Sequence, residues 1–273
     1  MSDYKIISLD LDGTLLDREM HVSRENREAI TALTARGIRI VPNSGRTLSE
    51  IPAELRDNPD IRYIIYSDGA AILDKQTGRT LPAYMSRELS EYVYGTLRRY
   101  RTMLSVRCRG ISYVKAEEHN EKDYISYRVP PLYRAFLYDT NLPTSDFDSF
   151  CRELGELEMI CAFFSDDAEL EACTRELRSG GELQVASSVP GNIEIFSIHA
   201  GKGNALRRLA RELGVDENAT IAVGDTTNDS DMIRKAGLGL AMANAVPELK
   251  AMAAAVACHH TEHIVSYLAK TYF

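Results

Sequence analysis

Strand-length apolar runs alternate with a helical segment near the start of the chain. Residues 5–9 and 38–41 have the composition of buried strands, and residues 24–36 between them carry apolar side chains at helical spacing after Ser23, a suitable N-cap. A strand, a helix and a second strand in this order place the two strands parallel. Residues 63–67 predict a third strand of the same kind.

The same alternation returns toward the end of the chain. Residues 203–214 predict an amphipathic helix, 220–223 a strand, 229–236 a short helix, 237–242 a strand and 247–256 a final helix. A doubly wound α/β core, Rossmann-like and built on a parallel sheet, accounts for both ends together.

The middle of the chain has a different pattern. Two strands flanking Arg109-Gly110 predict a hairpin, and further helices and strands follow without the regular alternation. We therefore expect an inserted α+β cap domain over residues 84–187. The discontinuous core would then comprise residues 1–83 and 188–273.

Charge and hydropathy exclude two classes of partner. The formal net charge is −8, which disfavours nucleic acids and anionic membranes because both are bound through basic surfaces. The longest apolar run, residues 251–258, is too short to span a bilayer. An anionic ligand would have to be held by local groups: a few cations, backbone N–H groups or a metal ion.

Cysteine usage and the N-terminal residues indicate a cytoplasmic protein. Five cysteines, an odd number without a CxxC pair, favour reduced thiols. The first 12 residues lack the basic and apolar regions of a signal peptide. The sequence gives no indication of the oligomeric state.

Two acidic clusters follow predicted core strands. DLDGT begins at Asp10 and GDTTND at Gly224. A turn explains Asp12 and Gly13, but it does not explain Asp10, which lies nearer the buried strand. Because parallel strands place their carboxyl ends on one edge, both clusters should meet there. Converging carboxylates predict a bound cation, with Mg²⁺ favoured because it prefers oxygen ligands.

Phosphoryl transfer suits this arrangement. One aspartate can attack phosphorus to form an aspartyl-phosphate, and a second, two residues along, can protonate the leaving oxygen and later activate water. Ser44 and the Gly45 N–H can donate hydrogen bonds to phosphate, Lys202 can supply a point charge, and Asn228 offers an amide near the metal.

The segments DLDGTLLD, NSGRT, HAGKGNAL and GDTTNDSDMI resemble, in order and spacing, the four motifs of the haloacid dehalogenase-like (HAD) hydrolases. The similarity is greatest to the Cof-type phosphatases, which carry a large α/β cap of the C2 type. Ser44 replaces the usual threonine and keeps its hydroxyl. Asp68 stands where the family generally has asparagine.

The resemblance implies a role for each motif residue. The nucleophile and metal ligand would be Asp10, and Asp12 would be the general acid/base and bind metal through its carbonyl. Lys202 would bridge the phosphate and the nucleophile. The remaining roles are phosphate binding and metal binding: Leu11, Ser44, Gly45 and Asn228 for phosphate, and Asp225 and Asp229 for metal.

We therefore expect a Mg²⁺-dependent phosphatase of small phosphorylated metabolites, with sugar phosphates the favoured class. Two alternatives stay open. A mutase or other phosphotransferase would use the same aspartyl-phosphate, and a non-catalytic protein would bind a phosphometabolite without turnover.

Overall fold

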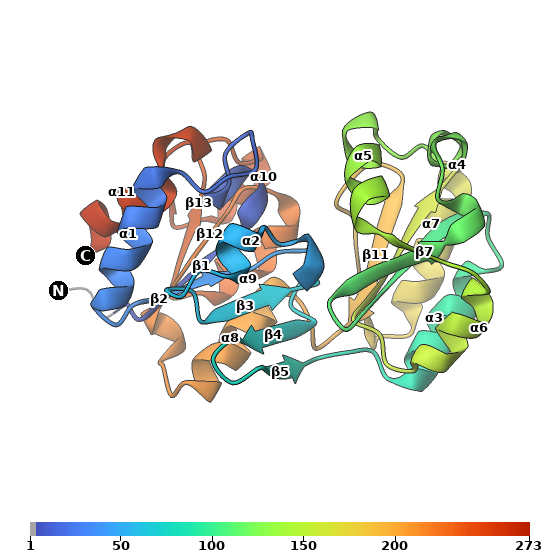
Figure 1. The fold of residues 1–273 in the computed structure, drawn as a ribbon, viewed down its shortest axis with the longest axis horizontal. Helices are drawn as coiled ribbons and strands as arrows, with labels where there is room; N and C mark the ends of the chain where they lie inside the picture. Colours follow the sequence, from blue (N-terminus) through green and yellow to red (C-terminus); the bar gives the residue numbers. More distant parts are fainter. Residues whose placement is uncertain (1–3) are drawn as a thin grey trace. The chain divides into compact units, whose positions relative to one another are not determined.

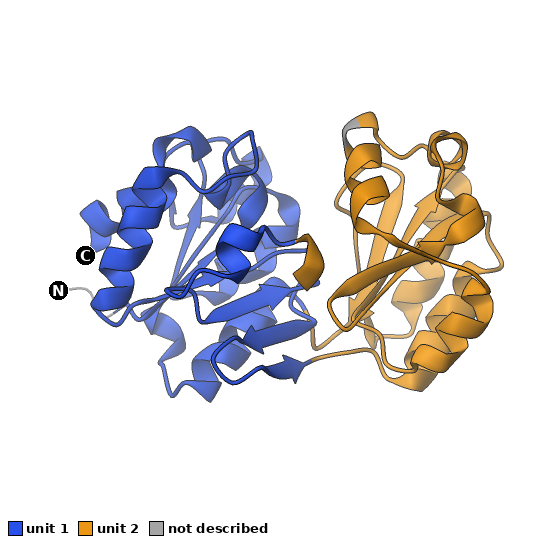
Figure 2. Ribbon diagram, viewed as in Figure 1, with its two compact units in different colours: residues 1–46, 51–82, 201–273 blue, residues 47–50, 83–200 orange. Residues whose placement is uncertain are grey.

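A computed structural model describes residues 4–273, except for the side chain at position 132. Residues 1–3, the start of the segment expected not to be a signal peptide, lie outside the described part. The chain divides into two compact units, shown in Figure 2. Unit 1 contains residues 1–46, 51–82 and 201–273, and unit 2 contains residues 47–50 and 83–200.

A five-stranded parallel sheet forms the centre of unit 1. Its order is β14-β13-β12-β1-β2, so β1, from the start of the chain, lies between β2 and the distant strand β12. The side chains of β1 are fully buried, which agrees with the apolar run that predicted this strand. The strand bounds are β1 (Ile6–Leu9), β2 (Arg39–Pro42), β12 (Thr220–Gly224), β13 (Leu238–Ala241) and β14 (Ala255–Val256).

Helices cover both faces of this sheet, as Figure 1 shows. The crossover from β1 to β2 runs in one direction along the sheet and that from β12 to β13 in the other. Right-handed crossovers therefore put α1 and α9 on opposite faces. Helix α11 packs on α1, and α8 packs on α9. The helix bounds in unit 1 are α1 (Arg24–Ala35), α2 (Ala53–Arg56), α8 (Lys202–Glu212), α9 (Ser230–Lys235), α10 (Pro247–Met252) and α11 (Ile264–Tyr272).

Local signals explain where α1 begins and ends. The Ser23 side chain accepts a hydrogen bond from the Asn26 N–H, and Gly37 adopts φ +82° just beyond the helix. Helix α10 ends at Met252, earlier than expected, and residues 255–256 form β14 at the sheet edge instead.

The third strand differs from its prediction. β3 (Tyr63–Tyr66) was expected to be parallel, but it pairs antiparallel with β4 (Ala71–Asp74), which pairs with β5 (Arg79–Pro82). One parallel bridge, Asn43 to Ile65, links β3 to the end of β2. The expected parallel orientation is therefore present only in this bridge, and the antiparallel pairing with β4 was not predicted, because an apolar run specifies a buried strand but not its partner.

Unit 2 is built on a mixed six-stranded sheet of order β10-β11-β9-β6-β7-β8. The predicted hairpin around Arg109-Gly110 is present as β6 and β7. The bounds in unit 2 are α3 (Arg87–Leu97), β6 (Thr102–Cys108), β7 (Ile111–Lys115), α4 (Glu121–Ser126), α5 (Pro131–Thr140), β8 (Leu142–Thr144), α6 (Phe147–Leu154), β9 (Met159–Phe164), α7 (Asp167–Ser179), β10 (Leu183–Ala186) and β11 (Asn192–Ser197).

The chain passes from unit 2 back into unit 1 at a later residue than the sequence suggested. The expected boundary was residue 188, whereas unit 2 extends to Ala200. Strand β11 pairs antiparallel with both β9 and β10, so residues 192–197 are held in the second sheet.

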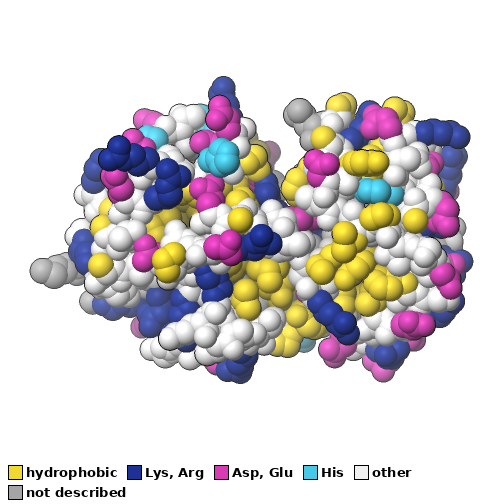
Figure 3. Space-filling view, in the orientation of Figure 1, with side chains coloured by type: hydrophobic (Ala, Val, Ile, Leu, Met, Phe, Trp, Pro, Cys, Tyr) yellow, Lys and Arg dark blue, Asp and Glu magenta, His cyan; other side chains and the backbone are white. Residues whose placement is uncertain are grey.

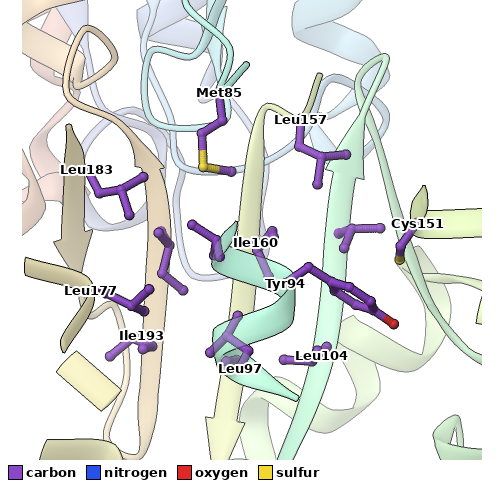
Figure 4. Packing of buried hydrophobic residues seen from close by; sticks show 14 of the residues in the cluster. Met85, Tyr94, Leu97, Leu104, Cys151, Leu157, Ile160, Leu177, Leu183 and Ile193 are labelled. Carbon is purple, nitrogen blue, oxygen red and sulfur yellow. The ribbon is translucent and has the colours of Figure 1, made fainter. Parts of the chain in front are cut away.

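Unit 2 has its own apolar core. Residues from α3, β6, β9 and α7 pack together, including Leu97, Leu104, Ile160 and Leu177, as Figure 4 shows. All five cysteines, at positions that the structure describes, are free, and four of them are buried.

Acidic and basic side chains are interspersed on the face shown in Figure 3. Among residues 4–273, no helix is both long and apolar enough to cross a membrane.

Candidate active site

The site lies in unit 1, where DLDGT follows β1. The Asp10 N–H donates to the Val223 carbonyl of β12, so its backbone continues the parallel ladder. The chain then turns, with the Leu15 N–H bonded to the Asp10 carbonyl and the Leu16 N–H to the Leu11 carbonyl. This turn leaves the Asp10 carboxylate at the carboxyl end of the sheet, buried at 5% exposure.

Lys202 joins two carboxylates from distant parts of the chain. Its Nζ lies 2.6 Å from Asp10 Oδ1 and 2.7 Å from Asp229 Oδ1, and its side chain is 1% exposed. Burial by itself would lower the pKa of Lys202, but the Asp10 and Asp229 carboxylates hold it above its usual range. The ammonium group therefore stays charged and fixes the position of Asp10.

Asp225 completes a group of three carboxylates. Asp10, Asp225 and Asp229 each have a carboxylate oxygen within 4.8 Å of the others. Burial, and then repulsion from Asp229, raises the pKa of Asp225 to about 7. Its Oδ1 is buried without a hydrogen-bond partner. Such an oxygen is disfavoured unless a proton or a cation accompanies it.

These three carboxylates fit a divalent cation. They carry more negative charge than Lys202 neutralises, and their oxygens are the ligand type that Mg²⁺ prefers. The structure therefore supports a metal site here. The identity of the ion belongs to the proposal below.

Asp229 also folds the loop that carries Asp225. Its Oδ2 accepts hydrogen bonds from the N–H groups of Asp225 at 2.9 Å and Thr226 at 3.1 Å, and Thr226 caps the turn in return. A Cβ on Gly224 would lie 2.3 Å from the Asp229 side chain. The loop is thus built around this carboxylate, which is 0% exposed.

Gly13 allows the two acidic loops to approach each other. Its φ is +72°, and a Cβ there would lie 2.2 Å from Asp225 Oδ2. The Asn244 side chain donates to the Gly13 carbonyl at 2.8 Å, which helps to hold the turn. We did not single out Asn244 from the sequence, because no motif marks it.

The NSGRT loop follows β2 and approaches the SDGAA turn. The Ser44 N–H donates to the Ile65 carbonyl, and the Asp68 N–H donates to the Ser44 carbonyl. A Cβ on Gly45 would lie 3.1 Å from the Asp68 carboxylate, which also contributes to the raised pKa of Lys202. Asp68 therefore belongs to the acidic surroundings of Lys202.

Arg46 makes a two-pronged contact with Asp12. Arg46 Nε donates to Asp12 Oδ2 at 2.9 Å, and the adjacent nitrogen donates to Asp12 Oδ1 at 2.7 Å. The sequence left open whether Arg46 reaches a substrate or forms a surface ion pair. In the structure its partner is the candidate acid/base.

Two further residues orient the start of α8, and sequence reasoning missed both. Buried Asn43 donates to the Lys202 carbonyl and to Ser8 Oγ, each at 3.0 Å. Asp231 accepts hydrogen bonds from the N–H groups of Gly203 and Asn204. Asn43 lies in the NSGRT motif and Asp231 in GDTTNDSDMI. Their place within these motifs was the sequence signal that could have marked them.

The predicted site residues are thus placed as follows. The structure brings Asp10, Lys202, Asp225 and Asp229 together, and Arg46 holds Asp12 through its side chain. No contact tests the phosphate-binding residues: buried Leu11, buried Ser44, Gly45, and Asn228, whose amide oxygen accepts from the Thr226 hydroxyl.

Comparison with known proteins identifies the family. A profile described as haloacid dehalogenase-like hydrolase matches residues 7–268. Phosphatase YwpJ of Bacillus subtilis (strain 168) is 29% identical over 97% of this chain and 99% of its own. The 5-amino-6-(5-phospho-D-ribitylamino)uracil phosphatase YwtE of the same strain is 29% identical over 96% of each chain.

A solved structure shows the same fold. A haloacid dehalogenase-like hydrolase from B. subtilis has a TM-score of 0.83 to this chain at 27% identity, covering 98% of this chain and 100% of that one. With the profile spanning both halves of the core, the chain belongs to the haloacid dehalogenase-like hydrolases, as a Cof-type phosphatase with an inserted cap.

Proposed function

We propose that this protein is a Mg²⁺-dependent phosphatase that hydrolyses small phosphorylated metabolites through an aspartyl-phosphate, with sugar phosphates the favoured class. The observation that carries this proposal is the buried Asp10 carboxylate, held by Lys202 beside two further carboxylates. A nucleophile in this setting is oriented before the substrate arrives.

In the first step, an Asp10 oxygen forms a bond to phosphorus while the bond from phosphorus to the ester oxygen breaks. Asp12 donates its proton to that leaving oxygen, which keeps the electron pair of the broken bond. In the second step, Asp12 takes a proton from water as the water oxygen attacks phosphorus. Asp10 leaves as a free carboxylate and inorganic phosphate is formed.

The remaining residues stabilise charge during both steps. Lys202 interacts with the transferring phosphoryl group while it holds Asp10. The Leu11 and Gly45 N–H groups, the Ser44 hydroxyl and the Asn228 amide are assigned to the phosphate oxygens. A Mg²⁺ ion held by Asp10, Asp225, Asp229 and the Asp12 carbonyl would neutralise phosphate charge when bound.

The name of a relative bears on the substrate class. The relative YwtE is named for a substrate with a phosphorylated ribityl chain, which is a sugar-alcohol phosphate. This name supports a polyhydroxylated phosphate monoester here. Substrate choice is assigned to the segment inserted in the core.

The decisive experiment measures phosphate release from a panel of phosphorylated metabolites, with Mg²⁺ or with EDTA. Asp10→Asn should lower the rate at least about a thousandfold, because the amide cannot form the acyl-phosphate. Asp17→Asn is the matched control, since Asp17 lies in the same DLDGTLLD stretch but caps its own turn through the Glu19 and His21 N–H groups.

Acid quenching followed by mass spectrometry should find phosphate on Asp10 in the wild-type protein. Equal turnover by Asp10→Asn and wild type would overturn the nucleophile assignment. Transfer of the phosphoryl group to an added sugar, in place of water, would identify a phosphotransferase. Tight binding of esters without turnover would identify a sensor.

A further inference from the structure

The contact between Arg46 and Asp12 is a bidentate ion pair. Two nitrogens of one guanidinium group donate to the two oxygens of one carboxylate, at 2.9 and 2.7 Å. The Arg46 side chain is 12% exposed, whereas that of Asp12 is 53% exposed. The arginine is therefore the fixed partner, and the carboxylate is the partner that would otherwise be mobile.

The backbone of Arg46 is itself held at both ends. Its N–H donates to Ser44 Oγ at 3.2 Å, and its carbonyl accepts from the Ser67 N–H at 2.8 Å. Planar two-pronged contacts restrict a carboxylate more than a single hydrogen bond does. The loop after β2 thus sets the direction of a side chain in the loop after β1.

We infer that Arg46 is a positioning residue that holds the Asp12 carboxyl group in the orientation from which it protonates the leaving oxygen. This inference rests on the proposed function, because it assumes that Asp12 is the acid/base. The contact with both oxygens is that of the ionised carboxylate, and in the protonated acid the oxygen without hydrogen can still accept from Arg46. In the step concerned, the Asp12 O–H bond breaks, a bond from hydrogen to the ester oxygen forms, and the carboxylate that results regains both contacts. The electron pair of the broken phosphorus–oxygen bond stays on that oxygen.

A role in positioning can be separated from a role in binding phosphate. An aryl ester with an acidic leaving group, such as p-nitrophenyl phosphate, departs without a proton. An alkyl ester such as glycerol phosphate needs the proton, because an alkoxide is a poor leaving group. Loss of a phosphate contact would slow both esters alike, whereas loss of positioning would slow the alkyl ester selectively.

The test compares kcat/KM for these two esters in wild type and in Arg46→Met. This ratio reports the phosphorylation step for both substrates, provided that neither binds at the diffusion limit. We expect the alkyl ester to fall about tenfold or more and the aryl ester less than about threefold. In an Asp12→Asn background, Arg46→Met should add no further selectivity, since the proton donor is already absent.

The matched control is Arg62→Met. Arg62 makes the same two-pronged contact with Asp74, at 2.9 and 2.8 Å, outside the site. Both esters should react with this variant as with wild type. Arg46→Lys keeps the charge but not the planar pair of donors, so it should show the same selectivity as Arg46→Met. It replaces Arg46→Met in the test if Arg46→Met folds poorly.

An equal fall for both esters, no change, or faster hydrolysis of the alkyl ester would each overturn the positioning role. The proposed function fails in a different way, namely if the wild-type protein hydrolyses neither ester. The two failures are therefore distinguishable in one experiment.

Discussion

Asp225 illustrates how a single residue can favour function over stability. Burial and the Asp229 charge raise its pKa to about 7 from an ordinary value of 3.8. Between these two values the folded protein holds a proton that the unfolded chain has lost. The free energy of unfolding of the metal-free protein should therefore decrease as pH rises through this range and level off above about 7.

Asp225→Asn should relieve this repulsion. In EDTA we expect the variant to be more stable than wild type, with a larger advantage at pH 8 than at pH 5, because the wild-type carboxylate is ionised at the higher pH. An increase of about 1 kcal/mol or more at pH 8 is reasonable for a mostly buried carboxylate. Thermal melting at both pH values measures the effect.

Magnesium provides the control for this experiment. Mg²⁺ should raise the melting temperature of wild type and have little effect on Asp225→Asn, which has lost a ligand. A variant that is no more stable than wild type at pH 8 would contradict the repulsion argument.

At the scale of elements, the start of α8 depends on its neighbour α9. The residue before α8 is Gly201, whose position offers no side-chain cap, so the first N–H groups need another acceptor. Asp231 of α9 supplies it, with its Oδ2 3.0 Å from the Gly203 nitrogen. Because Lys202 begins this helix, the cap also helps to direct the lysine toward Asp10.

Asp231→Ala should therefore reduce both stability and activity. Loss of a cap costs about 1 kcal/mol, and we expect kcat to fall several-fold because Lys202 is less well fixed. Asp216→Ala is a matched control, since Asp216 caps the turn before β12 by accepting from the Asn218 N–H. The control should lose similar stability and keep its kcat, as steady-state kinetics and melting can show. An unchanged kcat in Asp231→Ala would show that this cap does not help to position Lys202.

At the scale of the whole molecule, each unit contains its own buried core. Ile160 lies in the core of unit 2 and Ile7 in strand β1 of unit 1, and both are 0% exposed. Separate cores predict that the units can open separately.

Ile160→Ala should cost about 2–5 kcal/mol through the cavity that it leaves. Hydrogen exchange measured by mass spectrometry should show faster exchange within residues 83–200, while protection of residues 220–224 is kept. Ile7→Ala should produce the reverse pattern. Equal loss of protection in both units for either variant would show that they unfold as one body.

The sequence by itself determined the parallel core and the motif residues. Apolar periodicity and capping residues act over a few positions, so they predicted β1, α1, β2 and α8 without knowledge of their neighbours. Parallel strand order then implied that Asp10 and Asp225 meet, and the resemblance to a known family supplied their roles.

Only the tertiary structure decided which partners these elements take. It paired β3 with β4, retained β11 in the second sheet, joined Arg46 to Asp12 and placed Asp231 on α8. These contacts join separate elements of the chain, and several candidate partners have similar local preferences. The choice among them depends on which arrangement both buries the apolar strands and pairs the charged groups. That depends on the whole fold, so no local pattern in the sequence predicts it.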